Sequence, residues 1–93
     1  MQDIRVNQLD GEGSAYIFEV TVGEQKYKVN LSEEYYQELT GGKVTPEELV
    51  KRSFEFLLKR ESPEAILPEF ALPLINNYFP DYEKTMQQML NYS

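Results

Sequence analysis

The sequence predicts an α+β fold, in which an antiparallel β-hairpin or a three-stranded sheet is followed by a helix-rich C-terminal half that prolines divide into short pieces. Two runs of alternating apolar and polar residues meet at residues 23–24, as they do in a hairpin. From residue 33 onward apolar residues recur at helical spacing, and four of the five prolines lie between residues 63 and 80. A chain of 93 residues is the size of one domain, so we expect residues 1–93 to form a single α+β domain.

The hairpin is predicted over residues 15–31, AYIFEVTVGEQKYKVNL. Gly23 suits the first position of a type II′ turn, which needs a positive φ. A two-residue turn fixes the register, and the pairs on one face are then Val22–Gln25, Val20–Tyr27, Phe18–Val29 and Tyr16–Leu31. The pairs on the other face are Thr21–Lys26, Glu19–Lys28 and Ile17–Asn30. The first face is apolar and the second is polar, and a slip of one residue would destroy this separation.

A third strand is available upstream of the hairpin. Residues 3–9, DIRVNQL, place Ile4 and Val6 on one face, and residues 10–14, DGEGS, would form the connecting turn. A lone hairpin is only marginally stable in water, so either this strand or a cover of helices is required. The sequence leaves open whether residues 1–9 form the strand.

A short helix is predicted directly after the hairpin. Ser32 can cap the segment EEYYQEL, and the glycine pair at 41–42 would end it. The glutamates at its start favour the positive end of the helix dipole. We interpret these two acids, and the acids at 47–48, 81 and 83, as helix-start residues and not as a catalytic carboxylate pair.

A longer helix is predicted from residue 46 to about residue 61. Thr45 and Glu48 form a capping box, with Pro46 at the first helical position. The apolar stripe of this helix comprises Leu49, Val50, Phe54, Leu57 and Leu58. Phe56 lies off the centre of the stripe.

The prolines after this helix are predicted to act as corners. Proline has no N–H donor and its ring crowds the preceding helical turn, so these residues should divide the apolar segment into short helices over 63–67, 73–79 and 81–91. The corners would let the segment wrap a core. The core residues expected from it are Ile66, Leu67, Phe70, Leu72, Leu74, Ile75 and Phe79.

The chain contains no cysteine and no histidine. This composition excludes disulfides, thiolate nucleophiles, imidazole bases and the usual ligands of zinc and haem. The serines have no histidine to activate them, and the glycines do not form a phosphate-binding loop. We therefore expect a protein that is not an enzyme and that uses no cofactor and no metal.

The net charge is −7, which disfavours binding to nucleic-acid phosphates and to anionic lipids. A signal peptide begins with a basic region followed by an apolar run, and the first ten residues contain no such pattern. No apolar stretch approaches the roughly 20 residues that span a bilayer. We therefore expect a cytoplasmic protein with no membrane association.

Residues 43–60 are the one basic segment, with five bases and three acids. Three of the bases follow an acid by four residues, which is the favourable order on a solvated helix face. These pairs are Glu47–Lys51, Glu48–Arg52 and Glu55–Lys59. Arg60 has no such acid, because residue 56 is a phenylalanine. The alternative function is a nucleic-acid-linked regulator, similar to an antitoxin, that uses the basic helix 46–60.

The seven tyrosines and five phenylalanines exceed what so small a core needs. Aromatic residues are enriched at protein interfaces, and methionine adapts to irregular partner surfaces. We therefore favour a non-enzymatic protein–protein interaction module or regulatory accessory protein. Its partner is another protein or a second copy of the chain, which would form a homodimer. The expected partner-binding residues are Tyr35, Tyr36, Arg60, Tyr78, Tyr82 and Met89.

The block VTPEELVKRSFEFLLKRESPEAIL, followed by LPLINNYFPDYE, resembles a pattern shared by a group of small bacterial proteins of unknown function. In these proteins a β-hairpin precedes a helix of this kind, and a tyrosine, a phenylalanine and a proline follow near the end. The resemblance covers residues 15–83 and implies a bacterial, cytoplasmic protein. It implies no particular activity.

Overall fold

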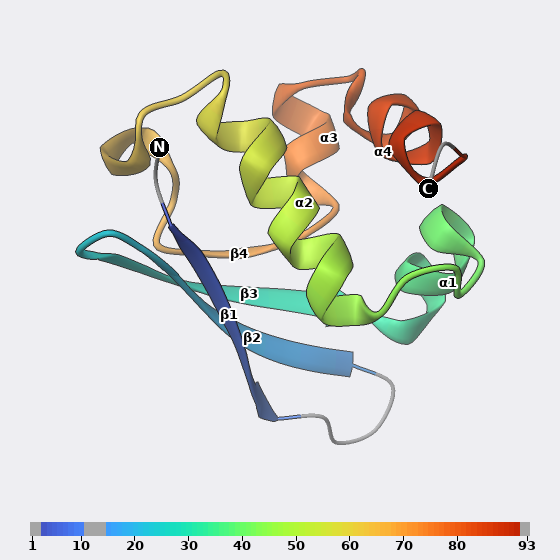
Figure 1. Ribbon diagram of the computed structural model, residues 1–93, viewed down its shortest axis with the longest axis horizontal. Coiled ribbons are helices and arrows are strands. Elements are labelled where there is room, and N and C mark those ends of the chain that lie inside the picture. The colour runs from blue at the N-terminus through green and yellow to red at the C-terminus, as the bar shows by residue number, and fades with distance from the viewer. Residues whose placement is uncertain (1–2, 11–14, 92–93) are drawn as a thin grey trace.

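The computed structural model describes residues 3–10 and 15–91, and it has the predicted α+β fold. Three antiparallel strands are followed by a helix-rich half that contains a short fourth strand (Figure 1). The elements are β1 (Ile4–Asp10), β2 (Ala15–Val22), β3 (Gln25–Ser32), α1 (Glu33–Thr40), α2 (Pro46–Leu58), the 3-10 helix η1 (Pro63–Ala65), β4 (Glu69–Ala71), α3 (Leu74–Tyr78) and α4 (Tyr82–Asn91).

The molecule has two layers. The strands form one sheet in the order β1-β2-β3-β4, in which β4 runs parallel to β3 and the other neighbours are antiparallel. Figure 1 shows α2 lying across one face of this sheet, with α3 and α4 beyond it and α1 at one end of the strands. The core lies between the sheet and α2, because the apolar face of the hairpin is turned toward the helices.

The hairpin has the predicted register throughout. Val20 pairs with Tyr27 and Phe18 with Val29, and these four side chains are buried. Gly23 has a φ of 61°, and no residue other than glycine in the described ranges has a positive φ. A positive φ at the first turn position alone is what a type II′ turn requires.

The predicted third strand is present as β1. Ile4 pairs with Val22 and Val6 pairs with Val20. The side chains of Ile4 and Val6 pack against the core. The register shifts between Gln8 and Asp10, which marks a β-bulge. Of the turn predicted at 10–14, residues 11–14 lie outside the described residues.

The predicted starts of the first two helices are confirmed. The side chain of Ser32 accepts a hydrogen bond from the backbone N–H of Tyr35 at 3.1 Å, and the Thr45 side chain accepts one from Glu48 at the same distance. Gly41, with a φ of 63°, caps the end of α1. The second helix ends at Leu58, earlier than residue 61.

The proline-rich segment differs from the prediction in its first part. Instead of a helix over 63–67, η1 forms a single turn over three residues, and Ile66 is extended. The chain then forms β4, which sequence reasoning missed. Backbone hydrogen bonds attach it to β3 at both of its ends, from Lys28 N–H to the Pro68 carbonyl at 2.8 Å and from Leu72 N–H to the Asn30 carbonyl at 2.9 Å. The two later helices lie within the predicted ranges 73–79 and 81–91.

Helix α2 is buried on two sides. Its predicted stripe faces the sheet, while Phe56, which lies off that stripe, is only 3% exposed. The Phe56 ring meets the rings of Phe79 and Tyr82 edge-on, with ring centroids 6.0 Å and 5.4 Å away. The prolines therefore turn the chain so that α3 and α4 cover this second side of α2.

Candidate functional site

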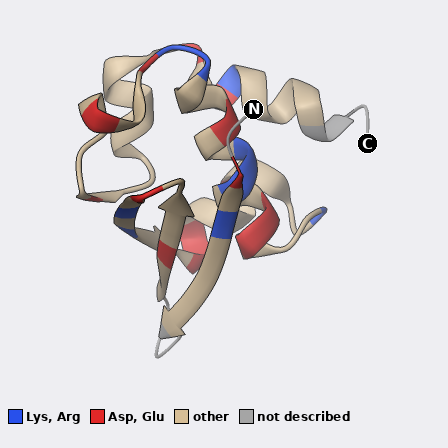
Figure 2. Ribbon diagram, turned by 60° about the vertical axis from the view of Figure 1, so that its left-hand side comes forward, with Lys and Arg blue, Asp and Glu red and all other residues tan. Residues whose placement is uncertain are grey.

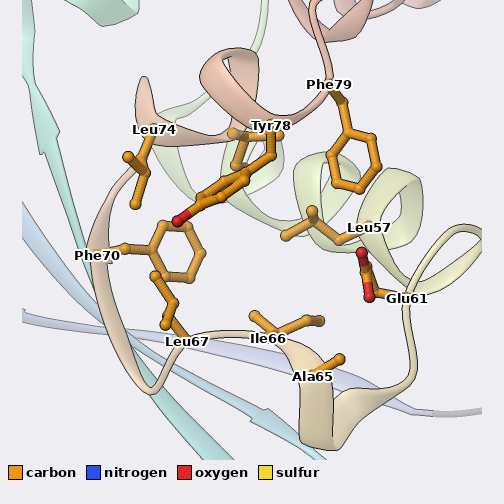
Figure 3. A pocket seen from close by; sticks show the side chains of 10 residues that line it. Leu57, Glu61, Ala65, Ile66, Leu67, Phe70, Leu74, Tyr78 and Phe79 are labelled. Atoms are coloured by element: carbon orange, nitrogen blue, oxygen red, sulfur yellow. The ribbon is translucent and has the colours of Figure 1, made fainter.

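An apolar groove lies where the end of α2, η1, β4 and α3 meet. It encloses a hollow of about 190 Å³. Figure 3 shows Ile66 and Leu67 on one side of the hollow, Tyr78 and Phe79 on the opposite side, and Phe70 pointing into it from β4. The full lining is Leu57, Glu61, Ala65, Ile66, Leu67, Phe70, Leu74, Ile75, Tyr78 and Phe79.

The rim of this groove exposes large apolar side chains. Tyr78 is 65% exposed and Leu67 is 45% exposed. Within the described residues, the other exposed large apolar residue is Leu9, on β1. Leu67 was expected in the core, and this prediction is wrong because the chain between η1 and β4 is extended at the surface. Two of the three exposed apolar side chains are thus gathered around one hollow.

Strand β3 holds in place the wall of the groove that residues 63–68 form. The hydroxyl group of Tyr27 donates a hydrogen bond to the carbonyl oxygen of Pro63, which holds η1 against the sheet. The bond from the Lys28 N–H to the Pro68 carbonyl holds the other end of the same segment. Burial raises the pKa of Tyr27, and the nearby carboxylate of Glu64 raises it further, so this hydroxyl keeps its proton. The wall is therefore attached at both ends.

The groove is bordered by acids. Residues 61–83 contain five acidic residues and no lysine or arginine. Glu61 is the charged residue in the lining, and Glu64 and Glu69 lie on the adjoining η1 and β4. In the described part of the chain, Glu69 lies 4.0 Å from Lys28, whereas Glu61 and Glu64 form no ion pair. An apolar hollow with unpaired carboxylates beside it favours a ligand that is both apolar and cationic.

The expected partner-binding residues are spread over three environments. Tyr82 and Tyr36, at 0% and 7% exposed, are core residues with almost no surface for a partner to contact. Tyr35 is half-buried, and its hydroxyl group donates a hydrogen bond to the Glu83 carboxylate at 2.9 Å. Met89 is also partly buried against the core. Of this group, Tyr78 is the one that borders the apolar groove.

Arg60, the sixth of these residues, is held by intramolecular contacts. Its guanidinium group lies over the Phe56 ring, 3.7 Å from the centroid. It also donates hydrogen bonds to Asp81 at 3.1 Å and to the Phe56 carbonyl at 3.3 Å. Arg60 and Met89 line a second, open hollow between α2, α4 and β1, on which Lys59 also lies. The arginine thus joins α2 to the turn before α4.

The exposed face of α2 carries both signs of charge. Figure 2 shows Lys and Arg positions along α2 and the following turn with Asp and Glu positions among them. Of the three expected ion pairs, the described residues form the one between Arg52 and Glu48, at 3.1 Å. Glu47 and Glu55 are exposed on the same helix. A phosphate that approached α2 would therefore meet carboxylates as well as bases, and this geometry adds nothing to the nucleic-acid alternative.

Three hollows on the described surface are each lined by one acid. These acids are Glu61, Glu55 and Glu38. Acid and base catalysis by carboxylates needs a pair that faces the same substrate. No group of three or more acids within the described residues could hold a metal ion. The absence of enzyme activity remains a prediction.

Among the residues that the structure describes, no helix is both long and apolar enough to cross a membrane.

Sequence reasoning missed the groove because it assigned the residues of its wall to the core. The run ILPEFALPL contains five aliphatic residues, a phenylalanine, two prolines and one glutamate. A clue was present in Leu67, which directly precedes Pro68. A residue before proline favours an extended conformation, so its side chain need not turn inward with a helical stripe.

Comparison of the chain with models of protein families, with curated proteins and with solved structures gives no match. The resemblance to small bacterial proteins over residues 15–83 therefore stays a prediction.

Proposed function

We propose that the protein is a non-enzymatic binding module and that the groove beside β4 holds an apolar side chain of a partner protein. The observation that supports this function best is that Leu67 and Tyr78 border the same hollow while exposing 45% and 65% of their surface. Single exposed apolar residues are ordinary, but an apolar rim around a hollow is typical of an interaction site. A hollow of about 190 Å³ suits one side chain the size of leucine or phenylalanine.

The charge distribution favours a separate partner over a second copy of the chain. Each copy has a net charge of −7, and the segment that forms most of the groove, residues 61–83, has no base. A homodimer formed through the groove would bring two acidic rims together, which is unfavourable. A partner with basic residues beside its apolar contact would be attracted instead.

A displayed library of random peptides tests the proposal with a defined probe. We expect the folded protein to enrich peptides that carry a leucine or an aromatic residue. Leu67→Asp and Tyr78→Asp should each weaken binding of these peptides by tenfold or more, since each places a charge at an apolar contact. Leu9→Asp is the matched control, because Leu9 is 55% exposed on β1 and does not line the groove.

Two outcomes would contradict the proposal. The first is no enrichment, or enrichment of peptides whose binding is the same in the groove variants and in Leu9→Asp. The second is a dimer, found by light scattering coupled to size exclusion over about 5 to 500 micromolar protein, that Leu67→Asp dissociates and Leu9→Asp does not. In that case the groove is the interface between two copies. All three variants replace exposed side chains, so their folding is checked simply by urea unfolding.

A further inference from the structure

We infer that the segment recognised by the groove is an extended strand that pairs with the free edge of β4, with lysine or arginine on either side of its apolar residue. This inference rests on the proposed function and specifies the chemistry of the partner. Three observations carry it: the direction of the backbone groups of β4, the side of the sheet on which the groove lies, and the acids beside the groove and on the opposite face.

Strand β4 forms one edge of the sheet, and its outer backbone groups are available. At the two ends of β4, the bonds to β3 use the Pro68 carbonyl and the Leu72 N–H. Hydrogen-bonding direction alternates along a strand in a parallel pair, so Phe70 also faces β3. The N–H and C=O groups of Glu69 and Ala71 then point outward. Four backbone groups on the free edge can therefore bond an added strand.

The alternation of side chains places an added strand in register with the groove. Phe70 is paired with Val29 on the helix-covered face, and its ring lines the hollow (Figure 3). A residue of an added strand that lies beside Phe70 and points to the same face would enter the hollow. Its two neighbours would point to the opposite face, because side chains alternate along a strand.

The neighbours of the apolar residue would meet negative charge. Glu69 lies on the polar face of the sheet with an exposed side chain, and its ion pair with Lys28 is long, at 4.0 Å. On the helical side of the groove, Glu61 and Glu64 have no ion pair with any residue that the structure describes. Lys or Arg on both sides of the anchor would therefore lie on the face that carries the Glu69 carboxylate, while Glu61 and Glu64 make the surroundings of the hollow negative.

The short length of β4 explains why both parts of the site are needed. A strand of three residues offers few backbone bonds, and short edge strands are one way in which proteins prevent unspecific pairing. The hollow alone holds one side chain. Recognition thus requires an extended backbone and an apolar residue at the correct position. With the basic flanks, the expected peptide pattern is an apolar residue with a basic residue directly before it and another directly after it.

Amide hydrogen exchange tests the backbone part of this inference. The probe is the best-enriched peptide from the displayed library, added to the full chain in excess and compared with the free protein. We expect the amide protons of Glu69 and Ala71 to exchange at least about tenfold more slowly in the complex. The amide of Phe70, already directed at β3, should change less. Equal protection of all three amides, or protection of none, would overturn strand addition.

Charge variants test the basic flanks. Glu69→Gln removes the carboxylate on the face to which the flanking side chains point, and Glu34→Gln makes the same change in net charge on α1. We expect Glu69→Gln to weaken peptide binding about 2- to 10-fold and Glu34→Gln to leave it almost unchanged. Equal effects of the two variants would show that only the overall charge acts, and would overturn the local recognition.

The results separate this inference from the proposed function. Peptides that lose binding in Leu67→Asp but carry no Lys or Arg, and that leave the Glu69 and Ala71 amides unprotected, would overturn the inference while supporting an apolar binding groove. A library that yields no peptide dependent on Leu67 would overturn both. Enriched peptides with the alternating basic and apolar pattern, and with both amides protected, would support both.

Discussion

The hydroxyl group of Tyr82 donates a hydrogen bond to Oγ of Ser53 across 2.6 Å, although both side chains are completely buried. The direction of this bond follows from the other bond of the serine, whose hydroxyl proton is given to the Leu49 carbonyl at 2.8 Å. Tyr82 lies at the start of α4 and Ser53 in the middle of α2. The bond therefore joins these helices inside the core, and it gives the one polar atom of Tyr82 a partner.

Removing the hydroxyl group of Tyr82 and removing that of Ser53 should lower the free energy of unfolding by different amounts. Tyr82→Phe removes the donor while Ser53 keeps its bond to Leu49, so we expect a loss of about 1 kcal/mol in the free energy of unfolding. Ser53→Ala leaves a buried hydroxyl group without a partner, which costs about 1–3 kcal/mol. Urea unfolding of both variants and of the double variant measures the coupling. Strict additivity of the two losses would contradict a direct bond.

Buried tyrosines should make the fold sensitive to alkali. Burial raises the pKa of Tyr82 above 10, and it does the same for Tyr35, with a further contribution from the Glu83 carboxylate. In the unfolded chain both groups lose their protons near the ordinary pKa of 10, so above that pH the native state binds more protons than the unfolded state. Stability should therefore fall as pH rises above 10. Urea unfolding at several pH values, together with tyrosinate absorbance, checks this; ionisation of all tyrosines while the chain stays folded would contradict it.

Elements set by neighbouring residues were predictable from the sequence. The hairpin register follows from Gly23 and the alternation on either side of it, and the starts of α1 and α2 follow from Ser32 and Thr45. In each case the residues that decide the structure lie within a few positions of each other. A pattern of this kind is visible in the sequence without knowledge of the tertiary contacts.

Features that depend on distant partners were not predictable in this way. Strand β4 has three residues, and its partner strand lies about 40 positions earlier, so no local alternation reveals it. The burial of Tyr36 and Tyr82 depends on acceptors that the fold supplies, the Val44 carbonyl and Ser53 Oγ. A tyrosine whose hydroxyl group finds such a partner can lie in the core. Fewer aromatic side chains therefore lie at the surface than the composition predicts.

The bond between Tyr16 and Glu33 should make stability depend on pH in the acid range. The Tyr16 hydroxyl donates to the Glu33 carboxylate at 2.5 Å, and this bond, followed by one from Gln37, lowers the pKa of Glu33 below 4.5. A lowered native pKa gives stability that is present above the ordinary pKa and is lost as pH falls through the lowered value. Tyr16→Phe should raise the pKa of Glu33, as followed by carbon NMR of its carboxyl group. An unchanged pKa in this variant would contradict the assignment.

Arg60 should stabilise the fold more through the Phe56 ring than through its ion pair. The pair with Asp81 is partly exposed, with side-chain exposures of 33% and 56%, and such pairs contribute little. The stacked guanidinium group adds a cation–π contact of about 0.5–1 kcal/mol. We expect Arg60→Ala to lower the free energy of unfolding by about 1 kcal/mol or more, and Asp81→Asn by less than half of that loss. Equal losses in urea unfolding would show that the ion pair carries the effect.

The free edge of β4 should be visible in the unbound protein. The amides of Phe70 and Leu72 point toward β3, and the bond from Leu72 to the Asn30 carbonyl measures 2.9 Å. The amides of Glu69 and Ala71 point away from it, and both residues are exposed. Exchange of a bonded amide requires local opening, whereas an outward amide is already in contact with water. Hydrogen exchange measured by NMR should therefore be slow at the amides of residues 70 and 72 and fast at the amide of residue 71. Similar rates at all three positions would mean that β4 does not pair stably with β3 in solution, and the edge that we infer as a docking site would then not exist.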